Sequence, residues 1–91
     1  MYTRMFGELV ASVRSYGIDA PIYPAIATIC GNTESQEIRN AQENLAIHFD
    51  GVFIGPNTDN LDRPVHRYDG CHFSEPGLQD HAKLWHAIFV D

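Results

Sequence analysis

The sequence predicts an α/β fold, specifically a partial three-layer α/β/α arrangement with parallel strands, in the order helix, strand, helix, strand, loop, helix. Apolar residues recur at three- and four-residue spacing in three segments, which is the periodicity of amphipathic helices. Two short, nearly continuous apolar runs lie between them and are typical of strands buried on both faces. Such alternation favours parallel strands with right-handed crossovers, and the 91 residues suffice for one domain at most.

The first predicted helix starts near residue 2. Its apolar residues form one stripe: Tyr2, Met5, Phe6, Leu9, Val10, Val13 and Tyr16. Gly17 follows this stripe directly, and a glycine there is typical of a left-handed cap at the C-terminal end of a helix. We therefore expect the helix to end at Gly17.

The two predicted strands are residues 21–29 and 52–54. The ordered part of the first should begin at Tyr23 or Ala25, and we expect both strands to be buried. Pro24 lacks a backbone donor, so we expect it near the start of the strand or at an unpaired position.

The two later helices are predicted from their caps and their stripes. Thr33 and Gln36 match a capping box, and Ser74 is a good N-cap residue for the last helix. The second stripe is Ile38, Ala41, Leu45 and Phe49, and the third is Leu78, Ala82, Trp85, Ile88 and Phe89. The polar connection 57–68 exceeds the ordinary length of a connector, which favours a functional loop.

The charge balance excludes some classes of partner. Six basic and twelve acidic side chains give a net charge of −6 with histidine neutral. This excess of negative charge argues against a nucleic acid or an anionic membrane surface as partner. No apolar run approaches the ~20 residues of a membrane span. The first six residues also lack the long apolar centre of a signal peptide.

Asp69 and His72 are the candidate catalytic residues. They stand three positions apart in the segment Asp69-Gly70-Cys71-His72, directly before the last helix. A carboxylate at this spacing can accept a hydrogen bond from one ring nitrogen of the histidine, which leaves the other nitrogen free to take a proton from a serine hydroxyl. The alternative is that Asp69 is a turn residue and His72 a loop histidine, since Asp-Gly is a common turn dipeptide.

The segment Arg67 to Phe73 resembles the last conserved block of the SGNH hydrolase superfamily, the GDSL-type serine esterases. Ala27 to Cys30 resembles the end of that fold's penultimate strand, and Ile54 to Asp59 resembles the end of its last strand. The resemblance covers nearly all of the chain and corresponds to the C-terminal part of a flavodoxin-like SGNH domain. The motifs are most similar to the carbohydrate-esterase branch, which implies O-acetyl groups on sugars as substrates.

The resemblance implies ester hydrolysis with Asp69 and His72 as two members of a Ser-His-Asp triad. His72 would be the general base and then the general acid, and Asp69 would orient it. The family's G-D-S nucleophile block is absent from the sequence. Ser35 and Ser74 are better explained as helix caps than as nucleophiles, and Cys71 would normally point away from the base that it precedes.

Arg67 and Asn32 are the candidate substrate-binding residues. In open parallel sheets, sites form at the carboxyl ends of the strands, where we expect the loops 31–33 and 57–72. Arg67 can pair with Asp69 or with a substrate, or it can be a surface residue. No metal or other cofactor is expected, because His66 and its neighbours lack the paired ligand spacings of zinc sites.

In the fold that the resemblance implies, Cys30 and Cys71 both lie just beyond strand ends. A disulfide between them is one possibility, and two free thiols are the other.

The interpretation is therefore the C-terminal segment of a serine ester hydrolase, acting on a small ester such as an acylated sugar. The alternative function is a non-catalytic, self-associating module derived from a truncated hydrolase. In either case we expect a homo-oligomer, or the missing N-terminal part of the same domain, to cover the faces and strand edges that the chain leaves open.

Overall fold

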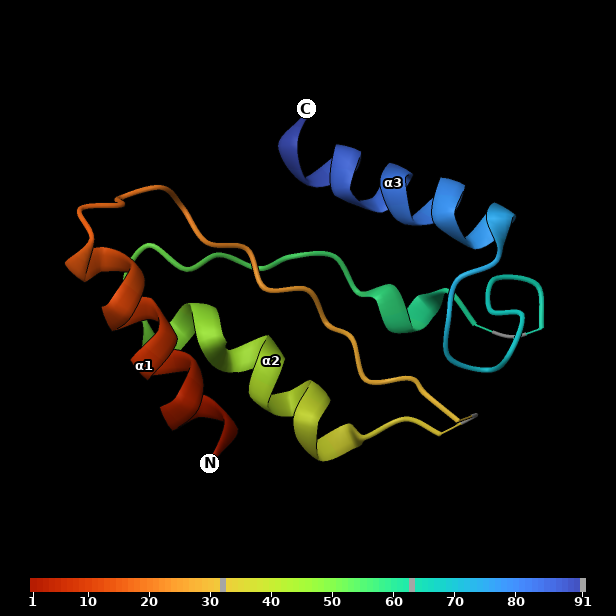
Figure 1. Ribbon diagram of the computed structural model, residues 1–91, viewed down its shortest axis with the longest axis horizontal. Helices are drawn as coiled ribbons and strands as arrows, with labels where there is room; N and C mark the ends of the chain where they lie inside the picture. Colours follow the sequence, from red (N-terminus) through yellow and green to blue (C-terminus); the bar gives the residue numbers. More distant parts are fainter. Residues whose placement is uncertain (32, 63, 91) are drawn as a thin grey trace.

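The computed structural model describes residues 1–31, 33–62 and 64–90, which form three α-helices and one short 3-10 helix. These are α1 (Tyr2–Ser15), α2 (Gln36–His48), η1 (Thr58–Asn60) and α3 (Glu75–Phe89). Two extended segments, the first covering residues 18–30 and the second residues 49–57, run between α1 and α2 on one side and α3 on the other (Figure 1). The predicted three-layer α/β/α fold is wrong, because the described residues contain isolated bridges and no sheet.

The two extended segments run in parallel and form two isolated bridges. One bridge joins Ile22 to Val52, and the other joins Ile26 to Asn57. The bridges differ in register by one residue. A regular parallel ladder needs evenly spaced pairs in constant register, so these bridges do not merge into strands.

Pro24 and the register shift explain why the sheet does not form. Pro24 lies between the two bridges and has no N–H to donate, although its carbonyl accepts from the N–H of Gly55 at 3.1 Å. The N–H of Ile26 then donates to the carbonyl of Pro56 at 2.9 Å, which places one extra residue in the second segment. Gly55 is required at this point, because a Cβ there would overlap the carbonyl of Pro24.

The burial of the extended segments also differs from the prediction. Ile26, Ile29 and Val52 are buried, whereas Ala27, Phe53 and Ile54 are exposed. Neither segment is therefore buried on both faces, which corrects the interpretation of the apolar runs as strands inside a parallel sheet.

The helix predictions are confirmed in their positions. The N–H of Gly17 donates to the carbonyl of Arg14 directly after α1, and Gly17 has the expected positive φ of 78°. The N-cap of α2 is Ser35, whose hydroxyl accepts from the N–H of Ile38, so the cap lies two residues after the predicted Thr33. None of the described helices is long and apolar enough to cross a membrane.

The helix α3 starts at its predicted cap, and part of its predicted apolar stripe faces the rest of the chain. The hydroxyl of Ser74 accepts from the N–H of Gly77 at 3.1 Å. The partly buried side chains in the middle of the helix include His81 and Trp85, whereas the predicted core residue Leu78 is exposed. At its C-terminal end, Phe89 packs edge-on against Tyr23 of the first extended segment, with ring centroids 4.8 Å apart.

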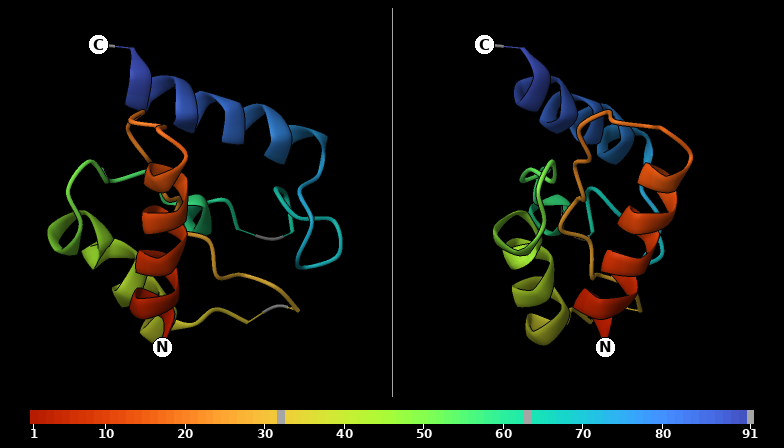
Figure 2. Two further views of the ribbon diagram at one scale, coloured as in Figure 1. Left: turned by 60° about the vertical axis from the view of Figure 1, so that its left-hand side comes forward. Right: turned by 90° about the vertical axis from the view of Figure 1, so that its left-hand side faces the viewer.

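The hydrophobic core lies between α1, α2 and the extended segments, on the opposite side from α3 (Figure 2). Its buried members are Val10, Leu45 and Val52, one from each of α1, α2 and the second extended segment. Tyr2, Phe6, Ile22 and Phe49 pack around them. Leu45 is the most enclosed residue, because its exposed fraction is 0 %.

We predict that Leu45→Ala lowers the free energy of unfolding by about 2–5 kcal/mol, because it removes buried surface and leaves a cavity. Urea denaturation followed by circular dichroism measures this change. Ile47→Ala on the same helix is the control, since Ile47 is 79 % exposed and its truncation should change stability by less than about 0.5 kcal/mol. Equal effects of the two substitutions would contradict this account of the core.

Candidate functional site

The candidate site is carried by a short loop, residues 67–73, which we call the histidine loop. Its two ends, Arg67 and Phe73, face each other in an antiparallel bridge, and the N–H of Tyr68 donates to the carbonyl of His72 at 3.2 Å. The tip of the loop carries Asp69 and His72. These contacts give a compact, hairpin-like turn that leads directly into α3 (Figure 1).

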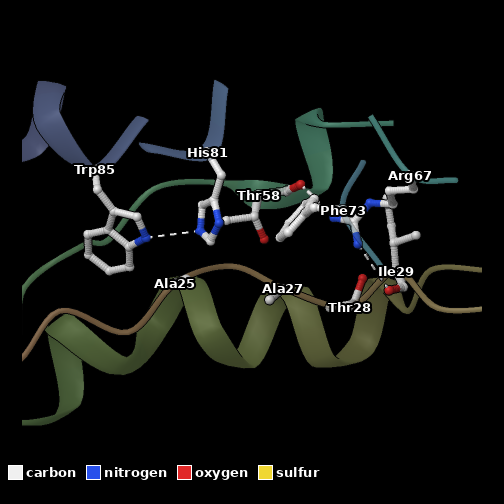
Figure 3. A pocket seen from close by; sticks show the side chains of 9 residues that line it. All are labelled: Ala25, Ala27, Thr28, Ile29, Thr58, Arg67, Phe73, His81 and Trp85. Carbon is white, nitrogen blue, oxygen red and sulfur yellow. Dashed lines mark hydrogen bonds between the residues drawn. The ribbon is translucent and has the colours of Figure 1, made fainter. Parts of the chain in front are cut away.

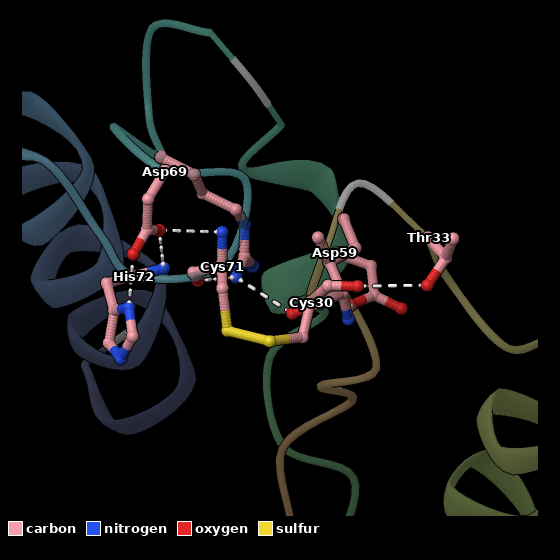
Figure 4. The surroundings of a disulfide bond; sticks show 8 residues. Cys30, Thr33, Asp59, Asp69, Cys71 and His72 are labelled. Atoms are coloured by element: carbon pink, nitrogen blue, oxygen red, sulfur yellow. Dashed lines mark hydrogen bonds and ion pairs between the residues drawn. A yellow bond between two sulfur atoms is a disulfide. The ribbon is translucent and has the colours of Figure 1, made fainter.

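The Asp69 carboxylate accepts three hydrogen bonds from its own loop (Figure 4). One oxygen accepts from the ring Nδ1 of His72 at 2.6 Å, and the other accepts from the N–H groups of His72 and Cys71 at 2.6 and 2.9 Å. The side-chain bond from His72, followed by these two backbone bonds, lowers the pKa of Asp69 from 3.8 to about 2. Asp69 is therefore ionised at any pH near neutrality.

The ring of His72 lies at the surface, with 69 % of the side chain exposed. Because Nδ1 donates to a carboxylate, the neutral ring carries its proton on Nδ1 and has its lone pair on Nε2. No described residue binds Nε2. The ring of Tyr68 stacks against that of His72 at 6.1 Å between centroids and supports its orientation. The expected hydrogen bond is thus present, while the catalytic role of the pair stays a prediction.

A disulfide between Cys30 and Cys71 fastens the histidine loop to the end of the first extended segment. The sulfur atoms are 2.11 Å apart and the two residues are 41 positions apart in the sequence. Of the two possibilities that the sequence left open, the structure has the disulfide. Because Cys71 lies between Asp69 and His72, the bond restrains the backbone that carries both members of the pair.

Arg67 enters the interior of the protein, since only 5 % of the residue is exposed. Its guanidinium donates to backbone carbonyls of four residues: Leu61, Ile29, Cys71 and Thr58. It lies 4.4 Å from the centre of the Phe73 ring and forms no ion pair with Asp69. A surface position is therefore excluded, and the substrate-binding role of Arg67 stays a prediction. Asn32, the other predicted substrate-binding residue, lies outside the described residues.

Asp59 is a buried polar centre that the sequence interpretation missed. Its carboxylate accepts from the N–H and hydroxyl of Thr28 at 2.8 and 2.6 Å, from the N–H of Ile29, and from Arg39 at 2.9 and 3.1 Å. Burial alone would raise the pKa of Asp59, but these hydrogen bonds outweigh it and lower the pKa below 3.8. Asp59 thus connects η1 to α2 and to the first extended segment. The only sequence signal was an acidic residue in a long loop.

A second acid–histidine pair was also missed. Nε2 of His66 lies 3.0 Å from an oxygen of Asp80, which connects the chain before the histidine loop to α3. Gly77 allows this close approach, because a Cβ there would overlap the carbonyl of His66. Within residues 1–31, 33–62 and 64–90, no group of three or more His, Cys, Asp or Glu side chains is arranged to hold a metal ion.

The serines of the two helix caps act as caps, as expected from the sequence. Ser35 accepts from the N–H of Ile38 at 3.1 Å, and Ser74 accepts from the N–H of Gly77 while donating to the carbonyl of Val65 at 2.6 Å. Among the described contacts, neither hydroxyl reaches the ring of His72. Among the described residues, Asp69 and His72 are therefore brought together without a cap serine at the His72 ring.

Comparisons with protein-family models, with curated proteins and with solved structures gave no match. The resemblance to GDSL-type esterases therefore depends on the residues of the chain itself, above all on Asp69 and His72.

We predict that His72→Ala raises the pKa of Asp69 from about 2 towards 3.8, because it removes the largest of the three stabilising contacts. The two backbone donors remain, so the pKa should stay below 3.8. Carboxyl chemical shifts in an NMR pH titration report this value directly. His86→Ala is the control, since His86 is an exposed histidine of α3, and it should leave the Asp69 titration unchanged.

The sign of the linked stability effect follows from the depressed pKa. Hydrogen bonding to the ionised form makes a contribution to folding that is complete above about pH 4 and is lost as the pH falls towards 2. An Asp69 that titrates near 3.8 in the wild-type chain would show that the pair does not form in solution.

Proposed function

We propose that Asp69 and His72 supply the acid and the base of a serine ester hydrolase, whose nucleophile comes from residues outside this sequence. The observation that carries the proposal is the 2.6 Å hydrogen bond from Nδ1 of His72 to Asp69, which leaves Nε2 exposed. An acid, an oriented histidine and a free Nε2 are what a serine needs for activation. The resemblance of residues 67–73 to the esterase motif supports the same chemistry.

The proposed mechanism uses the pair twice. Nε2 of His72 takes the proton of the serine hydroxyl as the serine oxygen attacks the ester carbonyl. The protonated ring then gives this proton to the leaving alcohol as the acyl-enzyme forms. In the second half, Nε2 takes a proton from the attacking water and returns it to the serine oxygen as the carboxylic acid leaves. Asp69 stays ionised and stabilises the protonated ring, which its low pKa favours.

Acylated sugars are the proposed substrates, with O-acetyl groups as the ester. The histidine ring stands on the surface of the chain rather than in an enclosed pocket, because most of its side chain is exposed. Such a position admits a bulky polar substrate that carries a small acyl group. The similarity to the carbohydrate-esterase motif supports this class of substrate.

We predict that the purified 91-residue chain hydrolyses aryl acetates no faster than its His72→Ala variant. The physical reason is that neither cap serine is placed to receive help from the base. Release of the phenolate, followed by absorbance, measures the rate. Turnover that is lost in His72→Ala and also in Ser35→Ala, Ser74→Ala or Cys71→Ala would show that the site is already complete.

The proposal itself is tested on the polypeptide encoded by the whole coding region around these residues, after a fluorophosphonate probe has located its reactive serine. His72→Ala should lower kcat/KM for acetylated sugars by ~10²–10⁴-fold, since general base catalysis is lost. Asp80→Asn is the matched control, because Asp80 belongs to the other acid–histidine pair, and it should leave kcat/KM nearly unchanged. Unchanged kcat/KM in His72→Ala would overturn the proposal.

Self-association is the second candidate function, and the exposed side of α1 favours it. Met5 and Leu9 are each 57 % exposed although they belong to the apolar stripe of this helix. Together with Tyr2 and Phe6 they line a shallow apolar hollow of about 270 Å³. A second copy of the chain would remove this surface from water.

We predict that sedimentation equilibrium at micromolar concentration finds the chain larger than a monomer. Leu9→Ser should shift the distribution towards the monomer, because it removes apolar area from the lining of the hollow. Ser12→Ala, an exposed position on the same helix, is the control and should leave the distribution unchanged. A well-folded monomer whose thermal unfolding is independent of concentration would contradict this second proposal.

A further inference from the structure

A cavity of about 300 Å³ lies between α3 and the extended segments (Figure 3). Its walls are mostly apolar and aromatic. The lining residues are Ala25, Ala27, Thr28, Ile29, Thr58, Arg67, Phe73, His81 and Trp85. The volume is at the lower end of the range for small-molecule sites, which starts near ~300 Å³, and is about twice that of a ~150 Å³ cavity known to accept benzene. The cavity can therefore hold a compact organic molecule.

The guanidinium of Arg67 is a buried positive charge at one end of this cavity. Four of its five N–H groups are directed at carbonyl oxygens, which solvate the charge but do not neutralise it. No described carboxylate lies within ion-pair distance of it. The nearby acid, Asp59, is already paired with Arg39. Because a buried charge without a counterion is costly, this end of the cavity favours an anionic group.

His81 supplies a second donor on the α3 side of the cavity. The indole N–H of Trp85 donates to Nε2 of His81 at 3.0 Å, which requires a lone pair on Nε2 and therefore a proton on Nδ1. No described residue accepts from Nδ1. The ring of Phe73 packs against this imidazole with centroids 4.7 Å apart. The cavity thus combines a cation and a free donor with a lining that includes the rings of Phe73 and Trp85.

We propose that this cavity binds a small organic monocarboxylate with an apolar, aromatic body. The carboxylate lies towards Arg67, where it neutralises the buried charge and accepts from the remaining guanidinium N–H. The body lies along the rings of Phe73, His81 and Trp85, which follow one another from the Arg67 end of the cavity (Figure 3). This site goes beyond the proposed ester hydrolysis, because it needs neither the Asp69–His72 pair nor a serine.

The cavity and the catalytic pair are connected through the histidine loop. Arg67 and Phe73, the two ends of this loop, line the cavity, whereas Asp69 and His72 occupy its exposed tip. Occupation of the cavity would hold the base of the loop in place. Binding is nevertheless measured without any turnover, so its outcome is independent of the proposed esterase activity.

Intrinsic fluorescence tests the proposal on the full 91-residue chain, because Trp85 is its one tryptophan and lines the cavity. Phenylacetate at neutral pH is the first probe, and phenylacetamide is its uncharged counterpart of nearly the same shape. We expect a saturable change with phenylacetate, with a dissociation constant of about 1 mM or below, and at least about tenfold weaker binding of the amide. No saturable change, or equal affinity for the two probes, would overturn the proposal.

A pair of matched substitutions locates the binding. Ala25→Leu fills part of the cavity and should weaken phenylacetate binding by about tenfold or more. Ala87→Leu makes the same change at an exposed position of α3 and should leave the affinity unaltered. Circular dichroism confirms that both variants are folded. Undiminished affinity in folded Ala25→Leu would place the ligand elsewhere and overturn the assignment. If this variant does not fold, the comparison of phenylacetate with phenylacetamide still tests the proposal.

Discussion

The middle of this chain depends on the buried guanidinium of Arg67, because the extended segments form no continuous ladder that could hold them together. It binds carbonyls that belong to the first extended segment, to the region of η1 and to the histidine loop. A lysine ammonium has three donors at one point and could not reach four carbonyls, so the planar fork of an arginine is needed. Asp59 has the complementary role with a negative charge, since its carboxylate accepts hydrogen bonds from Thr28, Ile29 and Arg39. Two polar centres thus replace much of what a sheet would provide.

The sequence predicted the helices well because the information that specifies them is local. Apolar spacing, Gly17 and the cap Ser74 all act within a few residues of the helix they define. The strands were predicted wrongly because an apolar run shows that a segment is hydrophobic but does not show how deeply it is buried. Whether two such runs form a sheet depends on their pairing, and here the missing N–H of Pro24 and the extra residue at Pro56 interrupt it. Both prolines are visible in the sequence, but the register shift between the segments is not.

The same distinction between local and distant contacts applies to the candidate site. Asp69 and His72 could be paired from the sequence because three residues of one turn separate them. The partners of Arg67 could not, since the carbonyl of Ile29 is 38 positions away and carbonyls leave no signature in a sequence. Asp59 and Thr28 are 31 positions apart and were missed for the same reason. The Cys30–Cys71 contact was foreseen only as one of two possibilities, because spacing alone does not decide whether two thiols meet.

The bond between Cys30 and Cys71 also determines the covalent topology of the molecule. It closes a ring of backbone that contains α2, η1 and most of the histidine loop, while α1 and α3 extend from the ring as two arms. A protease that cuts once inside the ring leaves a single covalent species, whereas a cut in either arm releases a fragment. The two arms are joined both by the disulfide and by the backbone between Cys30 and Cys71. The shorter of these connections keeps the local concentration of the arms high during refolding. The oxidised chain is in this respect a cyclic scaffold with two helical appendages, and reduction would turn it back into a simple linear polymer.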